Sequence, residues 1–460
     1  MGSSAWKQLA LLLTLALAVR LAAGAYWQSR IDGRFGFGDS ESYWTLGRAI
    51  ARGEPYEFGE PNARVFRTPG YPLFLAMIFA IFGDDPSVMW ARAQSAVLGM
   101  LAVAAVWWLA RELFDGRTGL IAAAIAAFYP GAVAMSALVL SEAPFCVLML
   151  VQLALGTAAW KAEKRGRAVG LAVVAGIVAG AATLVRPSWL WFTPLAAAVA
   201  VLARRSGEPQ GSSEPQGLSL RPPTRGDKPR GSLGSLGSRG SLGSLGSLGC
   251  GGGGRWRRAE MGAAMLVGLI VAMTPWWIRN AQVTGRFVPT TLQVGASLYD
   301  GLNPQATGAS DMAFVPQFVG EFQRQPAETD DPFEYRLDRR FRREAWAWAG
   351  ANPARATQLG GVKLVRMWNI WPNEPAFSSW PVRLAVFFTY VPILVFGIIG
   401  AARTIRSGWP YLLCWLLAVY FTALHVVFVS SIRYRQPAML GLIVLAAGVI
   451  GTRKKTAKRQ

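Results

Sequence analysis

Histidine and cysteine are scarce in this sequence of 460 residues, and their scarcity limits the sites that the chain can build. The one histidine, His425, lies in an apolar segment, so a zinc site made of several histidines is excluded and a packing role is expected. Cys146 and Cys414 lie in apolar runs, whereas Cys250 lies in a glycine-rich stretch. The sequence therefore predicts no disulfide framework.

Charged residues are also few, at 16% of the sequence, compared with about 25% in ordinary soluble domains. Apolar residues make up 52%, and several uncharged runs approach the roughly 20 residues that a helix needs to cross a bilayer. The chain is thus predicted to be an all-α polytopic integral membrane protein with about ten transmembrane helices. We place them at residues 7–27, 88–110, 118–136, 142–160, 168–186, 187–203, 259–278, 382–402, 409–429 and 436–452.

Two further apolar stretches, residues 71–82 and 362–371, are too short to span and are expected to lie in the interface or to re-enter. The first span also resembles a signal peptide, because Lys7 precedes it and small residues follow at 23–25. Arg20 interrupts that pattern. We therefore favour a retained anchor.

The net charge of +21 is explained by topology. The short connections at residues 111–117, 161–167, 403–406 and 453–459 are rich in Lys and Arg and fall on one side of the predicted bundle. Basic connections mark the cytoplasmic side, so both termini are predicted to be cytoplasmic. Because the basic residues are scattered over loops rather than gathered on one face, no nucleic-acid partner is expected.

The sequence divides into three parts. Residues 1–203 form an N-terminal membrane half, 204–258 a flexible Gly/Ser/Arg-rich cytoplasmic linker, and 259–460 a C-terminal membrane half with a basic tail. Two long non-cytoplasmic loops, 28–87 and 279–381, are of a length that usually carries function. Within the second loop, residues 334–349 predict a helix that lies either on the membrane surface or in solvent.

Two acids stand out at the non-cytoplasmic side. Asp39 lies in GDSESYW, just beyond the first span, and Arg64 and Arg67 follow in the same loop, so one short segment offers a candidate base and cationic phosphate ligands. Glu142 begins the fourth span at the same surface. An ionisable group at that depth indicates function, while the alternative is an acid that interacts with the helix dipole.

Arginines also gather at this surface, against the usual charge bias. Arg186 follows the fifth span, Arg279 follows TPWWI, and Arg433-Tyr434-Arg435 precedes the last span. The planar guanidinium group suits phosphate, so these positions favour an anionic ligand. A general preference of this sequence for arginine is the alternative.

Five short motifs occur in one order along the chain: GDSESYW, RTPGYPLFLAMIFAIFG, LSEAPF, TPWWIRNAQVTGRFVPTT and RYRQPAM. In this order the sequence resembles the dolichyl-phosphate-mannose protein mannosyltransferase and aminoarabinose transferase superfamily, over most of residues 1–203 and 259–452. The resemblance implies a GT-C-like bundle and a catalytic Asp39, with Glu142 matching a second acid. It also implies donor and lipid-phosphate contacts at Arg67, Tyr71, Arg279, Arg433, Tyr434 and Arg435.

The sequence departs from these relatives at two points. Ser40 follows Asp39, and Glu41 comes one residue later, so the Asp-Glu pair of the protein mannosyltransferases is missing and a protein acceptor is not implied. Phe66 precedes Arg67 where aminoarabinose transferases have an acid, so no metal site is predicted there. The sequence indicates no cofactor; a divalent metal ion would be compatible with the loop acids, but no ligand cluster points to one.

The resemblance implies a glycosyltransferase that moves a sugar from a polyprenyl-phosphate-linked donor to a lipid, glycan or protein acceptor outside the cytoplasm, with inversion. The expected setting is a bacterial plasma membrane, with membrane lipids as further partners. One alternative is a transporter or lipid flippase, which the intramembrane charges would also suit. Another is a non-catalytic assembly or sensor protein that uses the linker for contacts.

Overall fold

The computed structural model describes residues 3–31, 34–59, 63–202, 253–324, 330–371 and 379–451. Apart from one isolated bridge between Phe58 and Ala63, the regular elements of this part are helices. The helices of the bundle are α1 (Ser3–Gln28), α4 (Val88–Leu113), α5 (Gly116–Phe128), α6 (Pro130–Ala137), α7 (Glu142–Lys161), α8 (Arg165–Val185), α9 (Phe192–Leu202), α10 (Gly253–Thr284), α15 (Trp380–Thr404), α16 (Leu412–Val427) and α17 (Gln436–Gly451).

The predicted spans are found in the right places, but three of them differ in form. Within the described residues, seven helices are long and apolar enough to cross a membrane. The span predicted at 118–136 is instead the pair α5 and α6, bent by 57°, because Pro130 has no N–H to continue the helix. Those predicted at 187–203 and 409–429 form shorter apolar helices, Pro187–Leu202 and Leu412–Val427.

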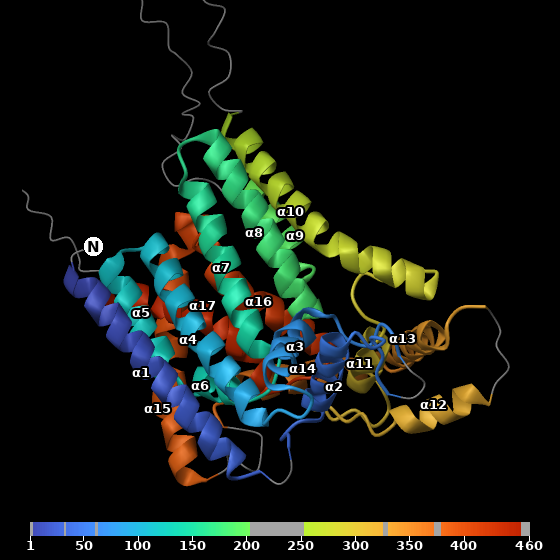
Figure 1. The fold of residues 1–460 in the computed structure, drawn as a ribbon. Coiled ribbons are helices and arrows are strands. Elements are labelled where there is room, and N and C mark those ends of the chain that lie inside the picture. The colour runs from blue at the N-terminus through green and yellow to red at the C-terminus, as the bar shows by residue number, and fades with distance from the viewer. Residues whose placement is uncertain are drawn as a thin grey trace, which may run out of the picture.

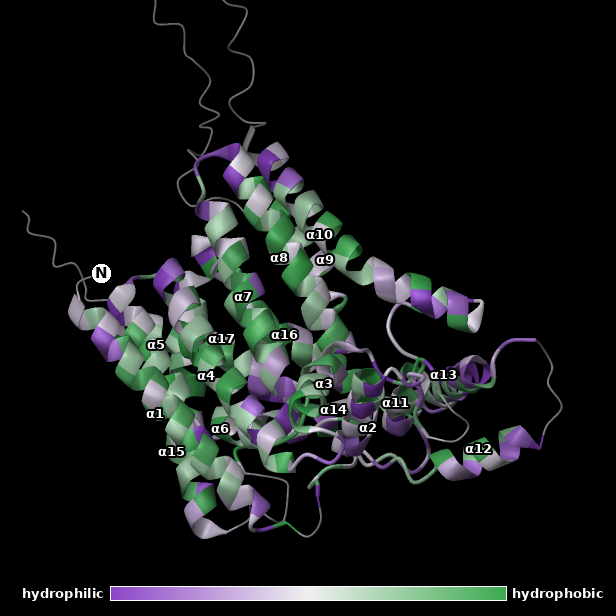
Figure 2. Cartoon of the chain, in the orientation of Figure 1, coloured by the Kyte–Doolittle hydropathy of each residue, from purple (hydrophilic) through white to green (hydrophobic). Residues whose placement is uncertain are grey.

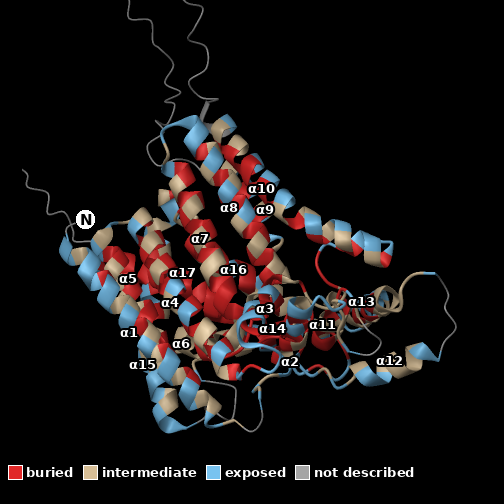
Figure 3. Ribbon diagram, viewed as in Figure 1, coloured by how far each residue is buried: buried red, intermediate tan, exposed pale blue. Residues whose placement is uncertain are grey.

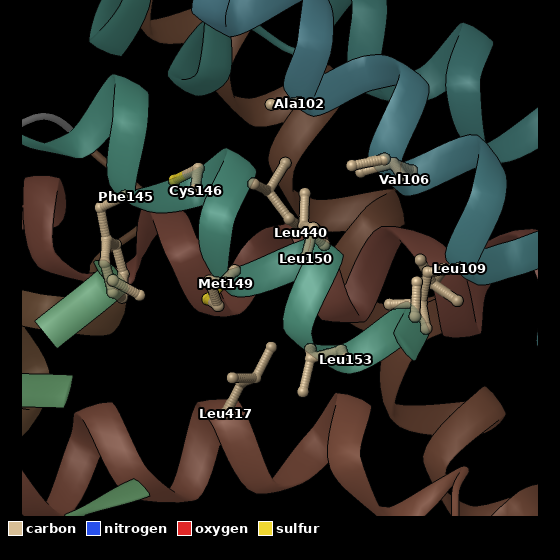
Figure 4. Close-up of a cluster of buried hydrophobic side chains, with 14 of the residues drawn as sticks. Ala102, Val106, Leu109, Phe145, Cys146, Met149, Leu150, Leu153, Leu417 and Leu440 are labelled. Carbon is tan, nitrogen blue, oxygen red and sulfur yellow. The ribbon is translucent and has the colours of Figure 1, made fainter. Parts of the chain in front are cut away.

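Two central helices, α7 and α17, carry the core. In their apolar windows 78% and 83% of the residues are buried, against 22% in α1 and in α15. Figure 3 shows the buried residues concentrated around α7, α16 and α17, and Figure 4 shows side chains of α4, α7, α16 and α17 meeting there, Leu150 and Leu440 among them. The exposed, apolar outer faces of α1 and α15 (Figure 2) are therefore the ones suited to contact lipid.

Arg20, unusual in a first span, stabilises the break between α5 and α6. Its guanidinium group is buried and donates hydrogen bonds to the carbonyl oxygens of Ala126 and Ala127, at 3.1 and 2.9 Å. These carbonyls end α5, where the helix itself offers no further donors. The charge of Arg20 is thus used inside the bundle, as a cap for a neighbouring helix.

The helices α8 and α10 approach closely at two glycines. A Cβ on Gly176 would lie 2.0 Å from the carbonyl oxygen of Met265, and one on Gly268 would lie 2.1 Å from that of Val173. Neither position has room for a side chain. Contacts of small residues are a common way to bring membrane helices together.

We expect Gly176→Ala to destabilise the fold by about 1–3 kcal/mol, because the added methyl group forces the two backbones apart. Gly170→Ala, on the same helix, is the matched control, since a Cβ there meets nothing within 4 Å. Thermal unfolding of the purified variants in detergent measures the difference. Equal melting temperatures for the two variants would contradict this packing.

The linker predicted at 204–258 ends too late, because α10 already begins at Gly253. The residues from Trp256 onward lead without a break into the apolar span, and extending a helix costs little once it has started. Residues 203–252 and 452–460 lie outside the described residues. The flexible linker and the basic tail therefore stay predictions.

The two long segments between spans are largely helical. The first contains α2 (Gly38–Arg52) and α3 (Gly70–Phe82), and the second contains α11 (Val294–Gly301), α12 (Val315–Gln323), α13 (Phe333–Ala351) and α14 (Pro353–Trp368). Among the described residues, three short 3-10 helices lie between the longer helices: η1 (Pro187–Trp189), η3 (Ile405–Ser407) and η4 (Ile432–Arg435). Figure 1 shows α2, α3, α11, α13 and α14 gathered toward one end of the bundle, away from the α7–α8 connection and the start of α10.

Helix α13 corresponds to the stretch predicted at 334–349. Its Phe341 is 2% exposed and packs on the rings of Tyr299, Phe314 and Phe318 from the same segment. Its apolar face therefore packs inside the extramembrane unit. Neither predicted role, a surface helix on lipid or a fully solvated helix, describes it.

Candidate active site

Asp39 lies in the first turn of α2 and meets two arginines. Its Oδ1 accepts a hydrogen bond from Arg67 Nη2 at 2.7 Å, and its Oδ2 accepts one from Arg433 Nη2 at 3.2 Å. The Asp39 side chain is 36% exposed, whereas those of Arg67 and Arg433 are 15% and 16% exposed. The carboxylate therefore stands at the open side of the cluster, with the cations behind it.

Arg67 is fixed by its surroundings. Its Nε donates to Ser42 Oγ at 3.1 Å, and its guanidinium carbon lies 4.8 Å from the ring of Tyr43 and 4.9 Å from that of Phe66. Ser42 and Tyr43 belong to α2, so the helix that carries Asp39 also positions its partner. Cation–π contacts of this kind form more often with arginine than with lysine.

Glu142 begins α7 and is 2% exposed. Its Oε1 lies 3.0 Å from Arg186 Nη1 and 3.2 Å from Arg433 Nε. Arg433 therefore bridges the exposed carboxylate of Asp39 and the buried one of Glu142, although Asp39 and Arg433 are far apart in the sequence. The structure brings together the two predicted acids, Arg67 and Arg433, and adds Arg186 to them.

Charge and burial give this cluster its chemical character. The three guanidinium groups of Arg67, Arg186 and Arg433 face two carboxylates, which leaves one positive charge in excess. Burial raises the pKa of the Asp39 carboxyl, but the charges of Arg67 and Arg433 outweigh it and lower that pKa to about 2. An ionised carboxylate beside surplus guanidinium charge suits a site that takes up an anion.

Tyr434 and His425 complete one wall of the site. The Tyr434 hydroxyl accepts a hydrogen bond from Arg433 Nη2 at 3.1 Å, and its ring stacks on that of His425, with centroids 4.2 Å apart. Nδ1 of His425 lies 2.8 Å from the carbonyl oxygen of Val429. The expected packing role of His425 thus places it against a site residue, which no sequence pattern between 425 and 434 indicates.

Two of the predicted arginines lie apart from this cluster. Arg435 is buried, lies 3.8 Å from the Tyr390 ring centre, and donates to the carbonyl oxygens of Met367 and Asn369. Arg279 donates to the carbonyl oxygen of Arg64 at 2.8 Å. Both hydrogen-bond the backbone of other segments. Among the described contacts they hold the scaffold together rather than meet Asp39 or Glu142.

Tyr71 lies beneath the cluster. It is fully buried, and its ring meets that of Tyr43 edge to face at 5.0 Å. It therefore supports the aromatic platform on which Arg67 rests. A small cavity adjoins the other side of Glu142, between α4, α6, α7 and α17, and is mostly apolar apart from Arg20, Ser136, Glu142 and Gln436.

Among the described residues, no group of three or more His, Cys, Asp and Glu side chains is placed to hold a metal ion. At the site, both oxygens of Asp39 and Oε1 of Glu142 are paired with arginines. The expectation about cofactors stays a prediction.

Part of the chain is similar to a known protein family. Residues 66–209 match the family model described as dolichyl-phosphate-mannose-protein mannosyltransferase, a range that includes Arg67, Tyr71, Glu142 and Arg186. No curated protein sequence is significantly similar to the chain. The match supports the resemblance over this range, which contains two of the five motifs, RTPGYPLFLAMIFAIFG and LSEAPF.

Solved structures extend the likeness to nearly the whole chain. The oligosaccharyltransferase AglB from Archaeoglobus fulgidus, solved with an inhibitory peptide and a dolichol-phosphate, aligns with a TM-score of 0.56 at 15% identity, over 97% of this chain and 50% of the archaeal one. The Archaeoglobus fulgidus enzyme with Zn and sulfate aligns with a TM-score of 0.53 at 16% identity, over 95% and 48%. This chain has the GT-C fold.

The GT-C chain spans about half the length of these archaeal oligosaccharyltransferases. ArnT from Cupriavidus metallidurans, bound to undecaprenyl phosphate, aligns over 98% of this chain and 78% of its own at 14% identity, with a TM-score of 0.42 that adds no support to the fold. At these identities the likeness concerns the GT-C fold.

Proposed function

We propose that this GT-C protein is a membrane glycosyltransferase that moves a sugar from a polyprenyl-phosphate-linked donor to an acceptor hydroxyl. The observation that carries the proposal is the cluster in which the partly exposed Asp39 pairs with Arg67 and Arg433. It combines a carboxylate at the open side of the cluster with fixed cations, at the end of the helical bundle where α2 and α3 lie. A lipid-linked phosphate and a polar acceptor would have to meet at such a place.

The reaction needs two kinds of group, and both are present. The acceptor oxygen forms a bond to the anomeric carbon while the bond from that carbon to the phosphate oxygen breaks, and its electron pair leaves with the polyprenyl phosphate. The acceptor proton passes to a carboxylate base, which we assign to Asp39. Arg67 and Arg433 stabilise the charge that grows on the departing phosphate. Attack opposite the phosphate inverts the anomeric centre.

Glu142 is assigned a supporting role. Its carboxylate is 2% exposed and pairs with two arginines, so an acceptor has no direct approach to it. We assign it to holding Arg433 and Arg186 in place. The sequence-based expectation of two catalytic acids is thus reduced to one base and one positioning residue.

The site is proposed to face the non-cytoplasmic side of a bacterial plasma membrane. Two observations support this side: the basic 161–167 connection lies at the end of the bundle away from α2 and α3 (Figure 1), and basic connections prefer the cytoplasm. A cysteine introduced at exposed Gln305 is then expected to react with an impermeant maleimide on intact cells. The native Cys250 is expected to react only after permeabilisation, and Cys146 and Cys414 are buried. Labelling of Cys250 from outside would show that the protein has the opposite orientation in the membrane.

Loss of the protein tests the proposed activity in the cell. If the donor is a polyprenyl-phosphate sugar, deleting the gene should make one lipid-linked sugar accumulate, and mass spectrometry of the lipid extract would identify that sugar. Restoring the wild-type gene should remove the accumulation, whereas Asp39→Asn should not. An unchanged lipid profile in the deletion strain would argue against a polyprenyl-phosphate donor.

A further inference from the structure

Asp39 and the proposed donor phosphate need the same partners. Both oxygens of Asp39 accept hydrogen bonds from Arg67 and Arg433, the two arginines assigned to the phosphate. The same pairing lowers the pKa of Asp39 to about 2 against the effect of burial. A carboxylate of such low basicity takes a hydroxyl proton poorly. While it is paired with the two arginines, Asp39 is therefore a weak base.

The contacts of the two arginines follow one pattern. Each uses Nη2 for Asp39 and Nε for a second, separate partner: Ser42 Oγ for Arg67 at 3.1 Å, and Glu142 for Arg433 at 3.2 Å. Either Nη2 group can therefore leave Asp39 while its guanidinium group stays anchored. Cation–π contacts with the rings of Tyr43 and Tyr434, at 4.8 and 4.9 Å, help to hold the two guanidinium groups as well.

We propose that the donor phosphate takes the place of the Asp39 carboxylate as the hydrogen-bond acceptor of the Nη2 groups of Arg67 and Arg433. In this exchange, Ser42 and Glu142 keep the two guanidinium groups in position. The exchange frees the Asp39 carboxylate to act as base only when a donor is bound. This inference rests on the proposed glycosyl transfer. Ser42 and Glu142 act in it as positioning residues.

The charges of the cluster agree with such an exchange. The groups that face Asp39 are Arg67 and Tyr43 on one side and Arg433 and Tyr434 on the other, with Glu142 and Arg186 behind Arg433. The excess of one positive charge matches the single negative charge of a phosphodiester donor. The donor can thus enter without expelling either carboxylate from the site.

The exchange has a consequence for pH dependence. In the free enzyme the two arginines keep Asp39 ionised down to strongly acid pH, and after exchange a phosphate anion stands nearby, which raises the pKa of Asp39. The fall of kcat at acid pH reports the pKa of the base in the donor complex, and the fall of kcat/KM reports its pKa in the free enzyme. We therefore expect the acid-side midpoint of the kcat profile to lie at least about one pH unit higher than that of the kcat/KM profile.

Asp39→Asn and Glu142→Gln each remove one negative charge, so comparing them distinguishes the proposed exchange from a general effect of charge on phosphate binding. The probe is polyprenyl phosphate, the sugar-free product, titrated onto purified protein in detergent at fixed ionic strength. Asp39→Asn removes the competitor and should tighten binding by about tenfold, the worth of one charge-assisted hydrogen bond. Glu142→Gln removes the same charge but loosens Arg433, so it should weaken binding. Ser42→Ala should also weaken it, and Ser42→Thr should restore it.

Glu41→Gln is the matched control, because it removes the same charge from an exposed position two residues along α2. Its affinity should stay within about twofold of wild type, since an exposed charge is largely screened. If Asp39→Asn binds no more tightly than Glu41→Gln, or if Glu142→Gln and Asp39→Asn both tighten binding alike, the exchange is overturned while Asp39 remains the assigned base. Failure of the wild-type protein to bind polyprenyl phosphate would overturn the proposed function itself.

Should Glu142→Gln fail to fold, size-exclusion chromatography will reveal it, and the Ser42 pair then decides. In that case the expected result is weaker polyprenyl phosphate binding in Ser42→Ala and near-normal binding in Ser42→Thr. Equal affinities for Ser42→Ala and wild type would overturn the positioning role. The pH profiles of kcat and kcat/KM give a second readout that altered stability alone would not move apart.

Discussion

Asp39→Asn is expected to lower turnover by about a hundredfold or more while the donor still binds. The amide keeps the shape of the side chain but cannot take up the acceptor proton, and general-base catalysis is worth about 10² to 10⁴ in rate. Steady-state transfer with purified, membrane-inserted protein measures the effect on kcat.

Asp84→Asn is the matched control for this variant. Asp84 lies at the same end of the bundle, is 71% exposed, and pairs with Arg52 at 2.8 Å. Because exposed ion pairs contribute little, its turnover should be close to that of the wild type. Near-normal turnover in Asp39→Asn would show that another residue is the catalytic base.

Arg433→Ala is expected to lower kcat/KM by about a thousandfold. Arg433 meets both carboxylates of the cluster and is assigned to the departing phosphate, and removing one preorganised donor to a developing anion costs about 10² to 10³ in rate. Donor affinity and turnover should both fall, since the cation meets the phosphate before and during transfer. Arg433→Lys should recover only part of this loss, because an ammonium group cannot reach Asp39, Glu142 and the Tyr434 hydroxyl in one plane.

Arg435→Lys provides the comparison within the same short helix. Arg435 donates to the backbone carbonyls of Met367, in the last turn of α14, and of Asn369, just after that helix, and it lies over Tyr390. Its replacement should therefore affect melting temperature more than kcat. Kinetic constants and thermal unfolding measured on both lysine variants would test the contrast. A larger kinetic defect in Arg435→Lys than in Arg433→Lys would show that the wrong arginine has been placed in the site.

The long spans could be predicted because their signal is local. Residues 88–110 and 142–160 are long apolar runs that each contain a single charged residue, Arg92 and Glu142. The corresponding helices are Val88–Leu113 and Glu142–Lys161. The bend between α5 and α6 was missed because hydropathy treats residues 118–136 as one run, although Pro130 interrupts its hydrogen bonds. The packing of α13 was not predicted, whether as a membrane-surface helix or as a solvated one, because the partners of Phe341 come from other parts of the same segment.

The site was predictable in part for the same reason. Asp39 and Arg67 share one loop, so their meeting follows from short sequence separation, whereas the meeting of Asp39 with Arg433 depends on the whole fold. Arg433 and Arg435 look equivalent in the sequence. In the short helix η4 their side chains diverge, one toward the acids and the other toward α14. Only the folded backbone distinguishes them.

The most direct test of the central claim is release of polyprenyl phosphate by the purified protein. The donor would be the lipid-linked sugar that accumulates in the deletion strain, supplied with a crude acceptor fraction from the same cells. The account predicts time-dependent release of polyprenyl phosphate with an inverted sugar on the acceptor, lost in Asp39→Asn and kept in Asp84→Asn. Absence of release by the wild-type protein, or equal release by both variants, would contradict it.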